Sequence, residues 1–586
     1  MVKFFKITRT VLPLLALLGA SMLAASAATR DGEFSIHVFT TGDVHGRYFD
    51  ELYTGGKVRR HSLLAVSAAV ENARRQYGRD NVILIDAGDA LQGDNAAYYF
   101  SYVDTASVHL FARMTDYMKY DALLVGNHDV ENGHAVYDRV RKSLSAPYLA
   151  GNAVKADGSP YFDSRTVIER QGLKFLILGY TNANIRNWLS PELWSGMSFL
   201  SLTRCVQADV DRAVAEVKPD AVIVAVHSGT GKGNGRELEN QGLDLFRSLK
   251  GVDALICAHD HRTFVECDGR KCLVNGGSHC RNVGHITLNL KVKNGDVASK
   301  NVNAEIVPVD ALKVDKKMKR RFAKDFNAVK TFSLRKVGEL SMPLVTRTAY
   351  RGMSDYMNFL HTVCLGYTGA DVSFAAPLSY NNSIESGDVL YNDLLSIYPY
   401  ENQLFVLTMT GEEIRRYLEV SYGRWINTYN GEGHILKIEN KADERTGSRL
   451  WSFIFRPYNF DSAGGLNYSV DVTADAGHRV RIASMADGTA FDPDATYKVV
   501  MTSYRANGGG YLLQEAGIDM SRIGERTVAR YPQVRDLIYD FFGKHEVVTP
   551  ESIGDNTIIG TWSFVPDELA SPALVGDARL LFPQFQ

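Results

Sequence analysis

The sequence predicts an α/β fold for about the first half of the chain, on three observations. Short apolar runs alternate with stretches of helical periodicity, the runs are bounded by glycine and polar residues, and each run ends in a cluster of Asp, Asn, Gly or His. Continuous apolar runs of this kind are typical of strands buried on both faces. Strands that alternate with helices form a sheet that binds ligands beyond the carboxyl ends of its strands.

The expected elements follow in chain order. Five strands are predicted at residues 34–40, 82–85, 122–125, 221–226 and 252–257. Two helices are predicted between them, at residues 58–77, where apolar residues recur at spacings of three and four, and at residues 107–120. The α/β pattern ends near residue 308.

Side chains of the types that can bind metals follow the strand ends in five clusters. They are Asp43, His45, Asp89, Asn127, His128, His227, His259 and His261. Carboxylate and amide oxygens mixed with imidazoles suit divalent ions such as Zn²⁺ or Mn²⁺. A single Asp-x-His or His-x-His occurs by chance, but five clusters at one structural position do not. The pattern offers enough ligands for two ions.

The motifs GDVHG, GD, GNHD, a strand-end His and His-x-His together resemble the calcineurin-like metallophosphoesterase superfamily. The resemblance implies two divalent ions of the Zn, Mn or Co class. One ion would be held by Asp43, His45 and His261, and the other by Asn127, His227 and His259. Asp89 would bridge them, because one carboxylate can serve two cations roughly 3.5–4 Å apart.

His128 has no ligand role in this scheme and resembles the family's non-ligand histidine, which acts as an acid or stabilises charge near the leaving group. The ions would activate a water that attacks phosphorus in line, and His128 would protonate the displaced alkoxide. In related nucleotidases an acidic residue three positions later orients this histidine. Glu131 stands there, and it is either that partner or a solvated surface residue.

The first residues predict export. Lys3, Lys6 and Arg9 precede an apolar stretch at residues 11–18 and the small residues Ala25-Ser26-Ala27. This is the pattern of a secretory signal peptide over residues 1–27, with an apolar core too short for a membrane span. We expect a periplasmic or secreted protein with no stable membrane anchor.

Composition agrees with an ordinary globular enzyme. The formal net charge of −2 and the lack of long basic runs argue against polynucleotide binding. The oligomeric state is not indicated. Six cysteines in an exported chain permit disulfides. Cys267 and Cys272 flank a turn and are either bonded or free, and the other four cysteines resemble core residues.

The predicted architecture has two domains. The metallophosphoesterase α/β sandwich covers residues 34–308, and a charged helical linker covers 309–335. A mixed α+β nucleotide-binding domain covers 336–545, and 546–586 form a C-terminal tail. In the second domain, Thr410 and Glu413 form a capping box that opens a helix.

Three segments, at residues 391–402, 458–468 and 502–511, resemble the C-terminal domain of the secreted nucleotidase family. The resemblance implies that Phe460 and Tyr504 sandwich the nucleobase, and we expect Asn381, Asp461, Asn507, Gly508 and Gly509 to contact the substrate as well. Stacking is worth about 1–3 kcal/mol per base. The alternative is that both rings pack in a core.

The C-terminal domain also indicates which phosphate position of the nucleotide is hydrolysed. The 5′-nucleotidase branch carries a phosphate-clamping Arg where this chain has Asn381, and an Asp where it has Gly510. YNFD and SYRANGG are close to the branch that hydrolyses 2′,3′-cyclic nucleotides and 3′-nucleotides. We expect that activity. The alternatives are a 5′-nucleotidase or nucleotide-sugar hydrolase, a hydrolase of a non-nucleotide ester, and a binding protein with an inactive metal site.

Overall fold

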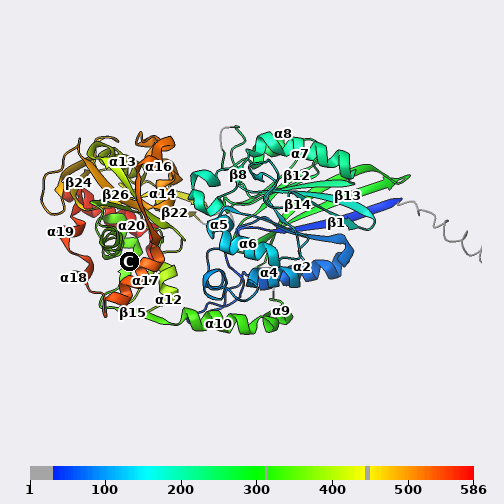
Figure 1. The fold of residues 1–586 in the computed structure, drawn as a ribbon, viewed down its shortest axis with the longest axis horizontal. Helices are drawn as coiled ribbons and strands as arrows, with labels where there is room; N and C mark the ends of the chain where they lie inside the picture. The colour runs from blue at the N-terminus through cyan, green and yellow to red at the C-terminus, as the bar shows by residue number, and fades with distance from the viewer. Residues whose placement is uncertain (1–30, 236–237, 310–312, 443–448, 586) are drawn as a thin grey trace, which may run out of the picture.

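The protein has two domains joined by a helical linker (Figure 1). The computed structural model describes residues 31–235, 238–309, 313–442 and 449–585, so the expected signal peptide lies outside the described residues. Within these ranges, none of the helices has the length and apolar character that crossing a membrane requires.

The N-terminal domain contains two six-stranded sheets. The first has the order β14-β13-β1-β2-β3-β4 and the second the order β11-β12-β10-β9-β7-β6. Strands of the first sheet are β1 (Gly32–Thr41), β2 (Val82–Asp86), β3 (Ala122–Leu124), β4 (Tyr148–Leu149), β13 (Asn282–Lys293) and β14 (Asp296–Pro308). Strands of the second are β6 (Arg165–Arg170), β7 (Leu173–Tyr180), β9 (Ala221–Val226), β10 (Ala254–Cys257), β11 (Thr263–Cys267) and β12 (Cys272–Gly276).

The sheets pack against each other through a buried apolar layer that includes Ile83, Ile177, Ile223 and Ile256. Helices α2 (Leu63–Tyr77) and α4 (Leu110–Met118) lie on one side of the sandwich, and α7 (Leu202–Val217) and α8 (Gly242–Ser248) on the other (Figure 1). The apolar runs of the sequence are therefore covered on both faces, and all five predicted strands are present at their predicted positions.

Both predicted helices are shorter than their periodicity suggested. The first begins only at Leu63, because the Ser62 side chain accepts a hydrogen bond from the Ala65 amide and caps it. The second begins after His109, whose ring caps the Phe111 amide, and ends at Lys119 in the left-handed region.

The linker contains α9 (Lys316–Arg321) and α10 (Ala323–Ser333), and α10 runs along the lower edge of Figure 1 toward the second domain. That domain is built on a five-stranded sheet of order β23-β17-β26-β20-β27. Its strands are β17 (Val372–Ala375), β20 (Gln403–Thr410), β23 (Ser462–Gly464), β26 (Thr496–Thr502) and β27 (Thr527–Gln533).

Three long helices pack around this sheet: α11 (Asp355–Thr368), α13 (Gly411–Trp425) and α17 (Val534–Lys544). The predicted capping box is confirmed, since Thr410 accepts from the Glu413 amide and Glu413 accepts from the Thr410 amide at the start of α13. The resulting helix buries Ile414, Tyr417 and Leu418 in the domain core.

Residues 546–586, predicted as a tail, are folded onto the second domain as far as the structure describes them. Strand β28 (Trp562–Val565) pairs with β24 (Leu466–Asp471), and α20 (Asp567–Leu581) contributes Leu574 and Leu581 to the core. The segment is thus part of the domain and not an appendage. Its short strand gave no clear periodicity in the sequence.

Cys267 and Cys272 close the hairpin between β11 and β12 with a disulfide bond. The register pairs these two residues directly across the hairpin. Cys257, Cys280 and Cys364 are buried and Cys205 is partly buried, each without a disulfide, as expected of core residues.

Candidate metal centre and substrate cleft

The seven side chains predicted to bind metal lie together beyond the carboxyl ends of the strands. Asp43, His45 and His261 form one group, and Asp89, His227 and His259 another; the ligand atoms within each group lie within 4.8 Å of one another. Asn127 joins the second group, because its Oδ1 is 2.9 Å from His259 Nδ1 and 3.1 Å from His227 Nε2. The two groups adjoin, since Asp43 Oδ1 is 3.9 Å from His227 Nε2.

The backbone at most of these positions is strained. Five residues have φ between 46° and 80°, namely Asp43, His45, Asp89, His259 and His261. Non-glycine residues seldom adopt this left-handed region, and each instance costs about 1–3 kcal/mol. Five such residues in one place indicate that the turns are shaped for a function and not for stability.

The polar atoms of this centre fit a cation. Asp43 Oδ1 is buried and accepts no hydrogen bond, with the Nε2 atoms of His261 and His227 at 3.8 and 3.9 Å. Asp89 Oδ2 likewise accepts no aligned hydrogen bond, although His227 Nε2 is 3.0 Å away. Leaving a buried carboxylate oxygen without a partner is costly. Divalent ions held by these oxygens and imidazoles would remove that cost.

A second layer of contacts orients the ligands. The ring Nδ1 of His45 lies 3.2 Å from the Gln92 carbonyl oxygen, and that of His227 lies 2.7 Å from the Ala87 carbonyl oxygen. Asp129 is buried and accepts hydrogen bonds from the amides of Asp89, Ala90, Leu91 and Gly126. Partners of this kind fix the tautomer and direction of metal ligands.

The pKa values of the two buried carboxylates of the centre are shifted in opposite directions. Burial raises the pKa of Asp43 well above its ordinary value. Burial also acts to raise the pKa of Asp89, but the neighbouring imidazoles of His227 and His128 outweigh it and hold that pKa well below its ordinary value. A bound cation would favour the ionised form of both carboxylates.

His128 and Glu131 form a pair at the edge of the centre. His128 Nδ1 is 2.5 Å from Glu131 Oε2, and Glu131 is only 9% exposed, so it is not a solvated surface residue. Burial disfavours the charged imidazolium, but the carboxylates of Asp89 and Glu131 outweigh burial and raise the pKa of His128 to about 9. The ring is therefore oriented by Glu131, and the neighbouring carboxylates favour its protonated form, which a proton donor requires.

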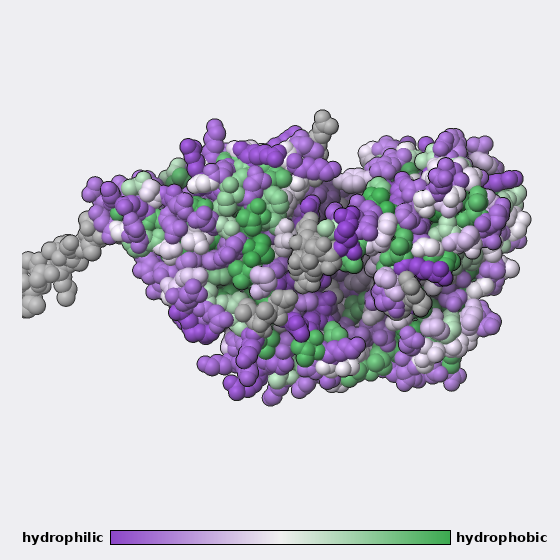
Figure 2. All heavy atoms as spheres, turned by 180° about the vertical axis from the view of Figure 1, so that it is seen from behind, coloured by the Kyte–Doolittle hydropathy of each residue, from purple (hydrophilic) through white to green (hydrophobic). Residues whose placement is uncertain are grey.

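The centre opens into a cleft of about 980 Å³ between the two domains. From behind, the surface is indented where the domains meet, and hydrophilic residues line much of the indentation (Figure 2). His45, His128 and His259 lie on the wall from the N-terminal domain, and Tyr458 and Tyr504 lie on the opposite wall.

Phe460 does not line this cleft, contrary to the prediction. Its side chain is fully buried in the core of the second domain and stacks on Trp425 at a centroid distance of 5.5 Å. No face of the ring is left for a base. The neighbouring Tyr458, two residues earlier, is the aromatic residue of that segment that reaches the cleft.

Tyr458 and Tyr504 face each other with ring centroids 6.4 Å apart and nearly perpendicular planes. Tyr504 is where the prediction placed it. Its ring lies against the backbone of Gly509, where a Cβ atom would come within 2.5 Å of the ring. The lack of a side chain at Gly509 therefore makes room for the Tyr504 ring. The prediction had instead assigned Gly508 and Gly509 to contact with the ligand.

Arg505 ties the two aromatic segments together. The guanidinium is buried and pairs with both carboxylate oxygens of Asp461, at 3.0 and 3.1 Å. It also donates to the carbonyl oxygens of Tyr458 at 2.7 Å and Gly509 at 2.5 Å. Asp461 was predicted to contact substrate, but in this structure its oxygens serve Arg505 and Tyr417.

The remaining predicted residues lie at or near the cleft edge. Asn507 Nδ2 donates to the Trp188 carbonyl oxygen of the other domain at 3.5 Å. Asn381 is not among the cleft-lining residues, although its neighbours Leu378 and Tyr380 are. Neither Asn507 nor Asn381 is placed against the metal ligands.

Sequence reasoning missed several residues of the site, which are Asp129, Trp188, Glu239, Tyr458 and Arg505. Asp129 and Tyr458 stood within the quoted motifs GNHD and YNFD but were given no role. Trp188 stacks on His259 at 5.2 Å and Glu239 pairs with the same ring at 3.0 Å. Both come from irregular loops without periodicity, so no local signal identified them.

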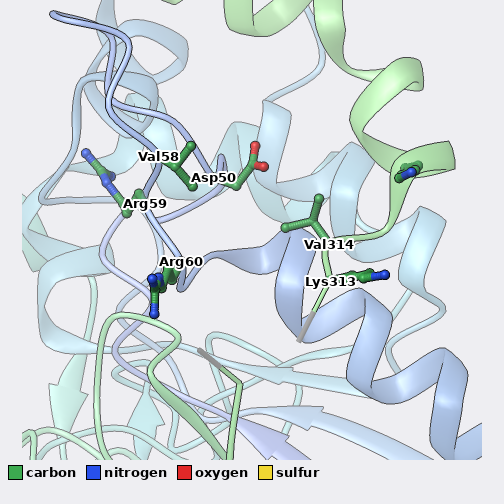
Figure 3. A pocket seen from close by; sticks show the side chains of 7 residues that line it. Asp50, Val58, Arg59, Arg60, Lys313 and Val314 are labelled. Atoms are coloured by element: carbon green, nitrogen blue, oxygen red, sulfur yellow. The ribbon is translucent and has the colours of Figure 1, made fainter. Parts of the chain in front are cut away.

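A second cavity, of about 350 Å³, lies between the loop at Val58 and the start of the linker (Figure 3). Figure 3 shows the charged ends of Arg59 and Lys313 pointing away from each other on opposite sides of it. None of its lining residues is a candidate metal or nucleotide contact. The interdomain cleft is therefore the candidate site.

Comparison with known families agrees with the two domains. Residues 36–263 match the model of the calcineurin-like phosphoesterase family, and residues 336–515 match that of the 5′-nucleotidase C-terminal domain. Together the two matches cover more than half of the chain.

The individual relatives have low sequence identity to this chain but align with most of its length. The chain is 23% identical to the trifunctional nucleotide phosphoesterase protein YfkN of Bacillus subtilis over 91% of its length, and it spans 39% of that protein. It is 23% identical to the 2′,3′-cyclic-nucleotide 2′-phosphodiesterase/3′-nucleotidase of Salmonella typhimurium, covering 85% of this chain and 84% of that one. A putative 5′-nucleotidase from Staphylococcus aureus shares the fold, with a TM-score of 0.74 at 22% identity, covering 90% of this chain and 99% of that one.

Proposed function

The chain belongs to the proteins that join a calcineurin-like phosphoesterase domain to a 5′-nucleotidase C-terminal domain, and we propose that it is an exported two-metal phosphohydrolase of 2′,3′-cyclic nucleotides and 3′-nucleotides. Membership gives the fold and the class of phosphoric ester hydrolase. The substrate, the site roles and export are the further steps of the proposal.

One observation carries the metal part. Unpartnered oxygens of the buried carboxylates Asp43 and Asp89 lie among imidazoles, of which His45, His259 and His261 line the cleft. When bound there, two divalent ions supply Lewis acidity to the phosphoryl oxygens and lower the pKa of water toward neutrality. Asp43, His45 and His261 would hold one ion, Asn127, His227 and His259 the other, and Asp89 both.

The chain's own groups supply the rest of the chemistry. His128 is held by Glu131 with its Nδ1 occupied, which leaves Nε2 to donate a proton to the departing alkoxide. Tyr458 and Tyr504 would take the base, and because their planes are now perpendicular, one ring must turn for a base to lie between them. Fixing base and phosphorus together orients the ribose between them.

The choice of phosphate position rests on two residues. A guanidinium clamp for a terminal phosphate is absent at Asn381, and an acid for the ribose is absent at Gly510. Both favour the cyclic-phosphodiesterase branch, and the relative from Salmonella typhimurium bears that activity in its name. A 5′-nucleotidase is the second candidate, favoured by the shared fold of the Staphylococcus aureus protein.

A product assay tests the proposal. Purified protein is supplied with Mn²⁺, Zn²⁺ or Co²⁺ and with 2′,3′-cyclic AMP, 3′-AMP or 5′-AMP. We expect kcat/KM to be higher for the first two nucleotides than for 5′-AMP. A clear preference for 5′-AMP would assign the protein to the 5′-nucleotidases, and turnover of p-nitrophenyl phosphate alone would remove nucleotides as substrates.

The mass of the mature chain from the periplasm or medium tests export, with loss of residues 1–27 expected.

A further inference from the structure

Glu239 lies between the metal ligands and the aromatic pair. Its Oε1 is 3.0 Å from Nε2 of His259, whose other ring nitrogen faces Asn127 in the metal centre. On the opposite wall, burial raises the pKa values of the Tyr458 and Tyr504 hydroxyls, and the negative charge of Glu239 adds to this effect. Glu239 therefore contacts a candidate metal ligand at one end of the cleft and lies within electrostatic range of the tyrosine pair at the other.

The backbone at Glu239 is anchored. Its carbonyl oxygen accepts hydrogen bonds from Asn182 Nδ2 at 3.0 Å and from Ser228 Oγ at 2.7 Å. Asn182 and Ser228 are both fully buried. Although Glu239 comes from a loop, its position is held by the core of the N-terminal domain, which is what a recognition residue requires.

Most of the other carboxylates among the described cleft residues are paired with protein groups. Glu131 pairs with His128 and Asp461 with Arg505. Glu401 pairs with Arg535 through Oε1, and its Oε2 has no hydrogen-bond partner, but the residue is only 6% exposed. Asp260 accepts from the Thr230 amide with one oxygen and from Asn275 with the other. The Glu239 side chain is one-third exposed, and no hydrogen bond to its Oε2 is present among the described residues.

The ribose of a nucleotide bound in the proposed way would lie beside Glu239. With phosphorus at the metal ligands and the base at the tyrosines, the sugar lies between His259 and the aromatic pair. A carboxylate there meets hydroxyl donors, and charge-assisted hydrogen bonds of this kind are about twice as strong as neutral ones.

We propose that Glu239 accepts a hydrogen bond from a ribose hydroxyl that the phosphate does not occupy, which in a 2′,3′-cyclic nucleotide is the 5′-hydroxyl, and so selects nucleosides that carry this hydroxyl over analogues that lack it. The inference rests on the proposed nucleotide hydrolysis and names the sugar contact within that same site. The selection arises from the contact itself, because a site built to bind a hydroxyl rejects the analogue that lacks it.

Nucleoside binding tests the contact without phosphate or turnover. The dissociation constants of adenosine, 2′-deoxyadenosine, 3′-deoxyadenosine and 5′-deoxyadenosine are measured by calorimetry on the metal-loaded protein and on Glu239→Ala and Glu239→Gln. In the wild type, loss of the contacted hydroxyl should weaken binding about tenfold to a hundredfold. In Glu239→Ala the same pair of nucleosides should bind equally, with Glu239→Gln intermediate.

The matched control is Glu216→Gln, an exposed glutamate paired with Arg165 outside the cleft, which should keep wild-type discrimination. If Glu239→Ala keeps the discrimination, or if the wild type binds all four nucleosides alike, the inference is wrong while nucleotide hydrolysis stands. If Tyr504→Ala also leaves adenosine affinity unchanged and nucleotides are not hydrolysed, the proposed function fails with it.

Discussion

The Nδ1 atom of His128 lies 2.5 Å from Glu131 Oε2, and the His128 backbone amide donates to Asp89 Oδ1 at 2.7 Å. One residue is thus held on its ring side by a dedicated acid and on its backbone side by the proposed bridging ligand. Its reactive nitrogen is directed by both contacts. We therefore expect the His128 ring to donate a proton through Nε2 and not to bind a metal ion.

Replacing His128 by Ala should lower kcat by about 10²–10⁴-fold, because a positioned proton donor contributes that much. Both metal ions should remain, and the loss should be greatest for substrates with poor leaving groups. Turnover and metal content measured on the same preparation check this. A metal-depleted variant would identify His128 as a ligand.

The tyrosines are expected to act on nucleotides alone. Tyr458→Ala and Tyr504→Ala should each raise KM for 2′,3′-cyclic AMP, since loss of a stacked ring costs about 1–3 kcal/mol, and should leave turnover of p-nitrophenyl phosphate close to normal. Phe460→Ala is the control, and it should instead destabilise the second domain by about 3–5 kcal/mol. Equal losses on both substrates would mean that the rings do not bind the base.

Arg505 should influence the base site through its backbone contacts. Arg505→Ala removes the hydrogen bonds to the Tyr458 and Gly509 carbonyl oxygens and leaves Asp461 buried without its partner. We expect a raised KM for nucleotides together with a lower melting temperature, because breaking a buried pair costs about 3–5 kcal/mol. Arg526→Ala, which breaks the ion pair with Glu413 elsewhere in the domain, should leave the nucleotide KM unchanged.

The sequence predicted the cluster of candidate metal ligands because each of them lies in the segment that follows an apolar strand. Asp43 after β1 and His227 after β9 occupy positions that the strand pattern defines. The aromatic site was predicted less well. YNFD places Tyr458 and Phe460 two residues apart, and only tertiary packing decides which ring enters the core beside Trp425.

Contacts made by loops were not predictable in the same way. Glu239 reaches His259 across 20 residues of chain, through a glycine-rich turn without periodicity. Arg505 was visible in the SYRANGG motif, but its hydrogen bonds to the Tyr458 and Gly509 carbonyl oxygens depend on how the backbone of two separate segments is directed. Long-range geometry of this kind leaves no local sequence pattern.

His361 predicts a pH dependence of stability. It is fully buried between the hydroxyl groups of Ser373 and Ser462, and burial lowers its pKa to about 3. In the unfolded chain a histidine titrates near 6.5. Below pH 6.5 the unfolded state therefore binds a proton that the folded state does not bind until about pH 3, so acid favours unfolding across this window.

The free energy of unfolding of the second domain should accordingly fall between pH 6.5 and 5, by at most about 1.4 kcal/mol per pH unit from this residue. His361→Gln should show a shallower dependence of melting temperature on pH over that range. The exposed His478 offers a control, and His478→Gln should keep the wild-type slope. Identical slopes for all three proteins would contradict the assignment.

The metal content of Asp89→Ala, measured by inductively coupled plasma mass spectrometry on the folded protein, tests the central claim most directly. Wild-type protein should hold two divalent ions per chain. Without the shared carboxylate, both ions should bind weakly and nearly all activity should be lost, while circular dichroism stays unchanged. An Asp89→Ala protein with near-normal metal content and turnover would contradict the two-metal account.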